Sequence, residues 1–159
     1  MSGKVVDADE LGQISRQLRA EGRKLVVTNG CFDLLHVGHV RYLQAARKLG
    51  DALAVGLNGD LSIRALKGSS RPLNGERDRA EVLAALGCVD FVAIFPEVRA
   101  ADFLERVQPA VYVKGGDYEP GTLDPEERAV IEKAEAEIRI IPFEKGYSTS
   151  ALIERMNGE

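Results

Sequence analysis

The chain contains 159 residues, and its 25 acidic and 21 basic side chains give a net charge of −4 at pH 7. This charge argues against general nucleic-acid binding, because an excess of basic residues supplies most of that affinity. Two cysteines are too few for a disulfide framework, residues 1–9 lack an apolar signal-peptide core, and no apolar run reaches the roughly 20 residues of a membrane span. We therefore expect a cytoplasmic protein that binds neither nucleic acid nor membrane.

Short apolar runs alternate with longer amphipathic segments along the chain. The apolar runs predict buried strands at 25–28, 52–57, 89–95, 110–113 and 138–141. Apolar residues at helical spacing predict helices at 9–21, 40–49, 61–66, 76–86, 101–107 and 124–136, with a last helix that opens at 146–150. The alternation indicates an α/β fold, a Rossmann-like parallel five-stranded sheet with helices on both faces. We expect one domain over 1–159, in which a packing helix within 1–22 precedes the core at 24–156.

The first predicted strand passes through a polar turn, Thr28 to Asp33, into His36-Val37-Gly38-His39, where a helix begins. The glycines of this junction allow the backbone to approach a ligand, and the new helix turns its unpaired N–H groups toward any bound anion. His36 and His39, the two histidines of the chain, can donate hydrogen bonds to phosphoryl oxygens and carry positive charge in a transition state. Because open α/β sheets bind ligands beyond the carboxyl ends of their strands, the junction predicts a nucleotide-binding site.

Other polar loops also follow strand ends. Asn58 and Asp60 follow the second strand. The segment 67–72, rich in glycine, serine and proline, is expected to be mobile, and its charges alone are typical of a solvated surface loop. Lys114-Gly115-Gly116-Asp117 follows the fourth strand. Its lysine can bind phosphate, and its aspartate can accept from sugar hydroxyls or help to hold a hydrated metal ion.

The start of the last helix has two interpretations. Ser148 and Thr149 are typical helix caps, but with the free N–H groups of the helix they can also hold the β- and γ-phosphates of a nucleotide. Arg77 and Arg79, in the amphipathic helix at 76–86, are expected to be surface residues rather than ligands. The polar loops singled out here follow strand ends, so they can converge on one crevice.

These motifs resemble the nucleotidyltransferase superfamily, which includes the cytidylyltransferases. The superfamily signature lies in 29–33 and 36–39, while 55–58, 113–118 and 146–150 are similar to the D-glycero-β-D-manno-heptose 1-phosphate adenylyltransferases. The resemblance covers about 24–156 and implies a strand order of 3-2-1-4-5, a homodimer, Mg²⁺ as cofactor, and ATP and a sugar phosphate as substrates. In many organisms this activity is fused to a sugar kinase, so the chain is expected to be the stand-alone form.

The resemblance implies three groups of site residues. The catalytic group is His36, His39 and Lys67. The nucleotide-binding group is Thr28, Asn29, Gly30, Cys31, Phe32, Asp33, Gly38, Lys114, Gly115, Ser148 and Thr149. The substrate-binding group is Asn58, Asp60, Arg71 and Asp117. No residue is assigned as a metal ligand, because Mg²⁺ bridges phosphates and keeps several waters. The implied reaction is adenylyl transfer from ATP to D-glycero-β-D-manno-heptose 1-phosphate, giving ADP-heptose and pyrophosphate.

Several alternatives remain open. A cytidylyltransferase acting on glycerol 3-phosphate shares the histidine signature, but these enzymes carry an Arg-Thr-x-Gly-Ile-Ser-Thr string where this chain has Phe143 in the arginine position and Tyr147 in the isoleucine position. This departure favours adenylyl transfer and removes one phosphate ligand, for which Lys145 is the candidate replacement. An FAD synthetase-like adenylyltransferase is a further alternative. The alternatives without catalysis are a nucleotide sensor and a zinc-binding module that uses Cys31, His36, His39 and Cys88.

Overall fold

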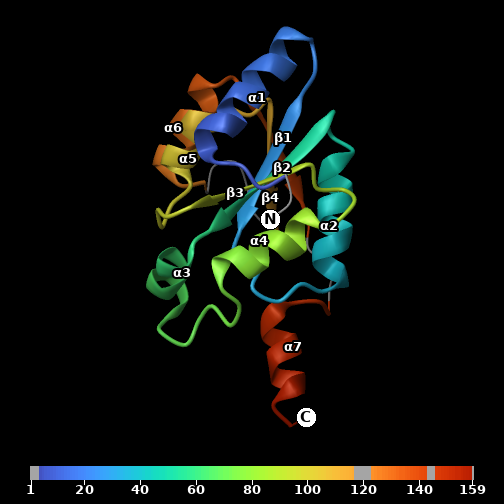
Figure 1. Ribbon diagram of the computed structural model, residues 1–159, viewed down its shortest axis with the longest axis vertical. Coiled ribbons are helices and arrows are strands. Elements are labelled where there is room, and N and C mark those ends of the chain that lie inside the picture. Colours follow the sequence, from blue (N-terminus) through green and yellow to red (C-terminus); the bar gives the residue numbers. More distant parts are fainter. Residues whose placement is uncertain (1–3, 117–122, 143–145, 159) are drawn as a thin grey trace.

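The computed structural model describes residues 4–116, 123–142 and 146–158. Within these ranges, parallel strands form a five-stranded sheet in the order β3-β2-β1-β4-β5 (Figure 1). The strands are β1 Leu25–Gly30, β2 Ala52–Asn58, β3 Phe91–Phe95, β4 Val111–Gly115 and β5 Glu137–Ile141. The predicted fold class and strand order are therefore confirmed. The central strand extends two residues beyond its predicted end, so Asn29 and Gly30 belong to β1 rather than to a turn.

Helices cover both faces of the sheet. The described helices are α1 Ala8–Ala20, α2 Val37–Arg47, α3 Asp60–Lys67, α4 Glu76–Ala84, α5 Ala101–Val107, α6 Pro125–Lys133 and α7 Thr149–Met156. Helices α1, α5 and α6 lie on one face of the sheet, and α2 and α4 lie on the other (Figure 1). Their apolar side chains form two separate core clusters. The helix predicted within 1–22 thus contributes to the core through Leu11 and Leu18.

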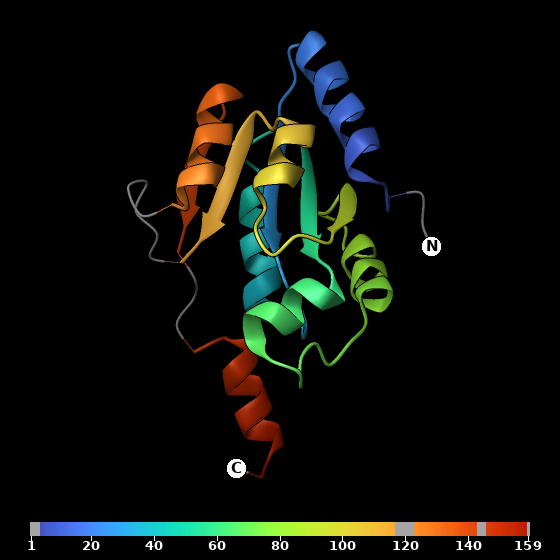
Figure 2. The same ribbon diagram turned by 90° about the vertical axis from the view of Figure 1, so that its left-hand side faces the viewer.

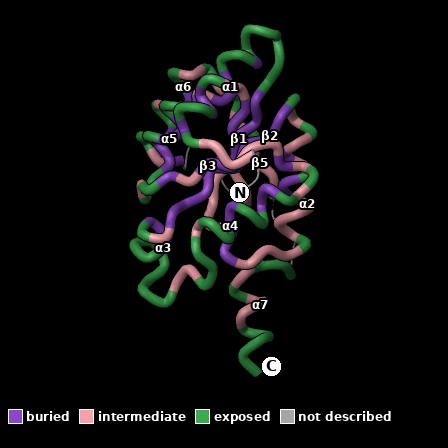
Figure 3. The backbone as a smooth tube through the Cα atoms, viewed as in Figure 1, coloured by how far each residue is buried: buried purple, intermediate pink, exposed green. Residues whose placement is uncertain are grey.

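The strands are apolar on successive residues because neighbouring residues enter different helix layers. Val27 belongs to the cluster beneath α1 and α5, whereas Val26 belongs to the cluster beneath α2 and α4. Burial is complete along β2 and along the first four residues of β1, and it is only partial along the edge strand β5 (Figure 3). Each fully buried leucine or valine stabilises the fold by about 1.5–3 kcal/mol relative to exposure, so the central strands form a rigid base for the loops at their ends.

The two ends of the described chain lie differently with respect to the sheet. Residues 4–6 run along the outer edge of β3, where Val5 pairs with Val92 as a parallel bridge. Helix α7 extends away from the sheet and contains no buried residue (Figure 2). In the described part of the chain, no helix is both long and apolar enough to cross a membrane.

Candidate active site

The carboxyl ends of β1 and β4 open into a cavity of about 440 Å³. Half of its lining residues come from the turn after β1, the start of α2 and the end of α3. Its lining residues are Asn29, Gly30, Cys31, Phe32, Asp33, His39, Tyr42, Lys67, Arg71, Lys114, Gly115 and Thr149. Eleven of the predicted site residues therefore meet in this main cavity. The twelfth lining residue, Tyr42, was not predicted from the sequence.

A second cavity of about 290 Å³ adjoins the first and lies between α2 and the start of α7. The two cavities share His39, Tyr42, Lys67 and Thr149. The second cavity is otherwise lined by His36, Gly38, Tyr147, Ser148 and Ser150. Lysine and arginine side chains line the main cavity, and the hydroxyl-bearing residues Tyr147, Ser148 and Ser150 line the second one. Such cations can bind the phosphates of a polyphosphate, and hydroxyl groups can form hydrogen bonds with the groups attached to it.

The two histidines are held by the backbone of the helix that they begin. His36 is the N-cap of α2, and its Nδ1 accepts a hydrogen bond from the backbone N–H of Gly38 at 3.1 Å. The Nδ1 atom of His39 accepts from the backbone N–H of His36 at 3.3 Å. Because both Nδ1 atoms are acceptors, each neutral ring carries its proton on Nε2. The arrangement produces two N–H donors that the protein backbone does not use.

Both imidazoles are neutral at pH 7. Burial lowers the pKa of His39 to about 4, with smaller contributions from the nearby His36 and Lys67, and burial also lowers the pKa of His36. The free protein therefore presents hydrogen-bond donors rather than imidazolium ions. A bound polyphosphate would supply negative charge beside the rings and raise both pKa values, so positive charge on the histidines would develop only with substrate present.

The lowered pKa of His39 makes folding stability depend on pH. Between about pH 4 and the ordinary value of 6.5, the unfolded chain binds a proton that folded His39 does not. We therefore expect the free energy of unfolding to rise as the pH increases through this window. Urea denaturation at pH 4.5, 5.5 and 6.5 measures it, with His39→Gln as the control that lacks the titrating group. A difference between the two proteins that does not change with pH would contradict the prediction.

Asp33 connects the turn after β1 to the loop that follows α3. Its carboxylate accepts from Arg71 Nε at 2.8 Å and from the backbone N–H groups of Leu73 and Asn74 at 2.9 and 3.0 Å. Burial opposes ionisation, but these hydrogen bonds outweigh it and lower the pKa of Asp33. Asp33 lines the main cavity as predicted, yet its acceptors are already used by the loop. Residues 71–74, which include the end of the segment 67–72 that was expected to be mobile, are consequently anchored to the turn after β1.

Three cations surround the main cavity in different ways. Lys67 is exposed and lines both cavities. Arg71 is paired with Asp33, and Lys114 lies 3.5 Å from the buried carboxylate of Glu127 on α6. Glu127 also accepts from the backbone N–H of Ala100 at 3.3 Å, so the position of its carboxylate is fixed. Two cations are thus held by carboxylates, while Lys67 projects from the end of α3.

Two tyrosines that sequence reasoning missed orient polar groups at the end of β1. The Tyr112 hydroxyl donates to Asn29 Oδ1, which leaves the amide nitrogen of Asn29 to face the cavity that this residue lines. The Tyr42 hydroxyl lies 2.7 Å from Thr28 Oγ1, and burial raises the pKa of Tyr42 to about 12. Thr28 is fully buried and does not line the cavity. It therefore supports the floor of the site from beneath.

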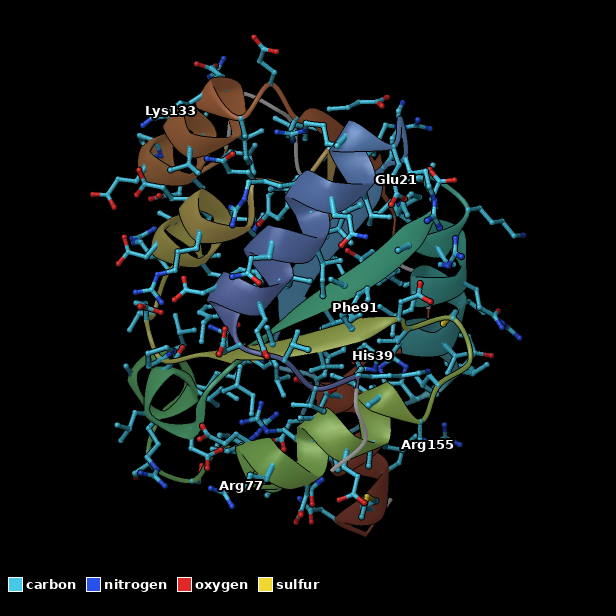
Figure 4. All side chains as sticks on the ribbon, turned by 45° about the horizontal axis from the view of Figure 1, so that its top comes forward. Glu21, His39, Arg77, Phe91, Lys133 and Arg155 are labelled. Atoms are coloured by element: carbon cyan, nitrogen blue, oxygen red, sulfur yellow. The ribbon has the colours of Figure 1, made fainter. Side chains whose placement is uncertain are left out.

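The expectation that Arg79 is a surface residue is wrong. Arg79 is 2% exposed, and its guanidinium donates to the carbonyl oxygens of Cys31, Asn58 and Asn74 and to Asp60 Oδ1, at 2.8–2.9 Å. Its neighbour Arg77 is exposed and lies on the outer side of α4 (Figure 4). A signal was present in the sequence, because Arg79 stands one residue before Ala80 and four before Leu83, both of which are buried.

Several predicted residues lie outside the main cavity. Asn58 donates to Ser62 Oγ at 2.8 Å, and Asp60 is paired with Arg79, so both stabilise the connection between β2 and α3. Gly38 and Ser148 line only the second cavity, where Ser148 caps α7 by accepting from the backbone N–H of Ala151. The predictions for Asp117, Phe143 and Lys145 fall outside the described residues.

A metal ion can be held by a group of three or more His, Cys, Asp or Glu side chains. Over 4–116, 123–142 and 146–158, no three His, Cys, Asp or Glu side chains are grouped as metal ligands. Asp33, the carboxylate in the main cavity, is occupied by N–H donors from the loop. Cys31, His36, His39 and Cys88 are likewise not grouped as metal ligands in the described part of the chain, so the structure does not support the alternative of a zinc site. Burial raises the pKa of the Cys31 thiol, which keeps it protonated at neutral pH.

Comparison with known proteins relates this site to a family. Residues 27–155 match the family described as cytidylyltransferase-like. The bifunctional protein HldE of Geotalea uraniireducens is 50% identical over 153 residues, and that of Geobacter sulfurreducens is 49% identical over 154. Each match covers 96% of this chain but 31% of the relative, so the chain spans about a third of the length of these proteins.

Solved structures give a similar result. The lipopolysaccharide core biosynthesis protein from Thermoplasma volcanium is 30% identical, with a TM-score of 0.63, and the match covers 80% of this chain and all of that one. A pantoate-beta-alanine ligase from Francisella tularensis, 14% identical with a TM-score of 0.59, shares the fold over 91% of this chain and 68% of its own. With the histidine signature, the sheet order and the family match over 27–155 in agreement, this chain belongs to the cytidylyltransferase-like family.

Proposed function

We propose that this protein transfers the adenylyl group of ATP to a sugar 1-phosphate, with D-glycero-β-D-manno-heptose 1-phosphate as the acceptor, giving ADP-heptose and pyrophosphate. The observation that carries the proposal is the pair of neutral imidazoles with Nε2–H donors at the junction of two cavities whose walls also hold Lys67, Arg71 and Lys114. Donors and cations without an activated nucleophile support direct transfer between two phosphates.

The reaction is a single displacement. An oxygen of the sugar 1-phosphate attacks the α-phosphorus of ATP, the new P–O bond forms as the bond to the β-phosphate oxygen breaks, and pyrophosphate leaves with that electron pair. His36 and His39 donate to the α-phosphoryl and leaving oxygens as their charge develops. Lys67 neutralises the polyphosphate from the end of α3. Mg²⁺, when bound, would supply positive charge to ATP and pyrophosphate.

The choice of acceptor rests on the relatives. The HldE proteins match almost the whole chain, and the Thermoplasma relative is named for lipopolysaccharide core biosynthesis. The family name alone would favour cytidylyl transfer. The sequence similarity to heptose 1-phosphate adenylyltransferases at 55–58 and 146–150 supports ATP and a heptose phosphate instead. A homodimer and a cytoplasmic location complete the proposal.

The proposal is tested by measuring pyrophosphate release with Mg²⁺ for ATP and CTP, each with heptose 1-phosphate and with glycerol 3-phosphate. Turnover with ATP and the heptose phosphate alone would support it. Turnover with CTP and glycerol 3-phosphate would overturn the substrate assignment while retaining the roles of the histidines. FMN with ATP serves as a third acceptor, because its turnover would indicate an FAD synthetase.

Replacement of Lys67 by alanine is expected to lower kcat/KM about 10- to 100-fold without changing the thermal unfolding midpoint. Lys67 lines both cavities but is exposed, so its removal withdraws a charge from the polyphosphate and leaves the core intact. Steady-state pyrophosphate release measures the effect. Arg64→Ala is the matched control, since Arg64 lies on the same helix, carries the same charge and is absent from the cavity walls. Equal losses in both variants would contradict a specific role for Lys67.

A further inference from the structure

A row of aromatic rings extends from the turn after β1 to the start of α7. The ring centroids of Phe32 and His39 are 5.3 Å apart, and those of His39 and His36 are 3.9 Å apart. Tyr147 continues the row, because its centroid lies 6.3 Å from that of His36 with an angle of 22° between the ring planes. The guanidinium of Arg41 lies 5.6 Å from the centroid of Tyr147. The row thus connects both histidines to a residue that is 115 positions away from the β1 turn residue Phe32.

The close approach of Tyr147 depends on Gly38. A Cβ atom at position 38 would lie 2.8 Å from Tyr147 Cβ and 2.9 Å from the His36 ring, both closer than side-chain contacts allow. Only a residue without a side chain leaves room for both rings at the start of α2. The glycine of the histidine signature therefore does more than admit a ligand, since it also allows Tyr147 to reach His36.

Tyr147 stands between His36 and solvent. His36 Nε2 is buried and has no hydrogen-bond partner among the described residues, whereas Tyr147 is 43% exposed. The two residues together line the 290 Å³ cavity and a smaller one of about 40 Å³ beside it. We infer that Tyr147 is a positioning residue for His36. The Tyr147 ring covers the imidazole and holds its Nε2–H group toward the bound phosphates. The inference deepens the proposed function and rests on it.

The charged groups near His36 do not provide an alternative means of holding it. His39 and Lys67 line the 290 Å³ cavity with His36, and Arg155 lines the smaller one. No carboxylate belongs to the described lining of either cavity. Among the described residues, the one hydrogen bond to the imidazole nitrogens of His36 is the bond that Nδ1 accepts from the backbone N–H of Gly38. The faces of the ring are contacted by the rings of His39 and Tyr147.

The chain's two histidines make a direct test possible, because a long-range ¹H–¹⁵N spectrum then contains two imidazole patterns. Wild type, Tyr147→Ala, Tyr147→Phe and Glu154→Gln are compared at pH 7.5, with Glu154 chosen as an exposed α7 residue outside the cavities. We expect an Nε2–H pattern for His36 in wild type, Tyr147→Phe and Glu154→Gln. In Tyr147→Ala the His36 nitrogens should shift toward a mixture of tautomers while those of His39 remain in place.

Kinetics provide the second measurement. Tyr147→Ala should lower kcat about 10- to 100-fold and change KM for ATP less than twofold, and Tyr147→Phe should restore kcat. An unchanged His36 pattern in Tyr147→Ala would overturn the inference. So would a Tyr147→Phe variant as slow as Tyr147→Ala, because the hydroxyl rather than the ring would then be responsible. If wild type itself released no pyrophosphate, the proposed function would fail, while the spectra would still decide whether Tyr147 holds His36.

Discussion

Replacing His39 with alanine is expected to lower kcat about 100- to 1,000-fold, because it removes one preorganised donor from the point where the two cavities meet. The ground state should be affected less. In the proposed reaction, neutral His39 would donate one hydrogen bond to bound ATP, and this bond would strengthen as the α-phosphoryl group becomes pentacoordinate and the imidazole gains charge. The loss should therefore fall on kcat more than on KM for ATP.

Single-turnover measurement of pyrophosphate formation distinguishes this effect from slow product release. The fold of the variant is checked by circular dichroism and thermal unfolding, because His39 also accepts the backbone N–H of His36. That contact is one helix-capping hydrogen bond and contributes about 1 kcal/mol. His39→Gln keeps a side-chain N–H donor and should recover part of kcat. A folded His39→Ala protein with turnover within fivefold of wild type would exclude a catalytic role.

Replacing Arg79 with methionine is expected to destabilise the fold by about 3–5 kcal/mol, because the substitution leaves Asp60 and three carbonyl groups without their buried donor. For a domain of this length the unfolding midpoint should fall by roughly 10 °C. The effect is large because the carbonyl groups belong to Cys31, Asn58 and Asn74. One guanidinium thus joins the ends of β1 and β2 to the loop before α4.

Arg77→Met is the matched control for this prediction. It removes the same charge from the same helix at an exposed position, so its effect on the free energy of unfolding should stay within about 0.5 kcal/mol. Urea denaturation of both variants measures the difference. Similar midpoints for the two would mean that water replaces the guanidinium at Asp60 and the carbonyl groups. The buried Arg79 guanidinium would then contribute little to the free energy of unfolding.

Strands and helices could be predicted from the sequence because their signals are local. The run 52–57 is apolar throughout, as both faces of β2 are covered, and Asp124 with Pro125 marks the start of α6 by capping chemistry. The order of the strands has no local signal. Periodicity shows which residues are buried but not which strand pairs with which, so the order 3-2-1-4-5 came from the family resemblance.

The candidate site was predictable to the extent that it depends on strand ends. His39 and Lys67 lie on helices that follow parallel strands and Lys114 lies at the end of β4, so all three reach the main cavity at one edge of the sheet. The same reasoning did not distinguish Asn58, at the end of β2, and Asp60, at the start of α3, whose side chains bind other residues of the protein rather than line the main cavity. Glu127 could not be linked to Lys114, because nothing in the intervening sequence shows that α6 places this carboxylate beside β4.

The anchoring of residues 71–74 by Asp33 affects the thermodynamics of substrate capture. Fixing the backbone of one residue costs about 1–2 kcal/mol of conformational entropy. For the anchored residues this cost is met when the protein folds, so it does not weaken ATP binding. The exposed residues 68–70, between α3 and these anchored residues, are the part of the loop that Asp33 does not hold. If the cavity holds a polyphosphate as proposed, the Asp33 carboxylate would favour its binding by fixing this part of the loop in advance, even though its own negative charge opposes an anion.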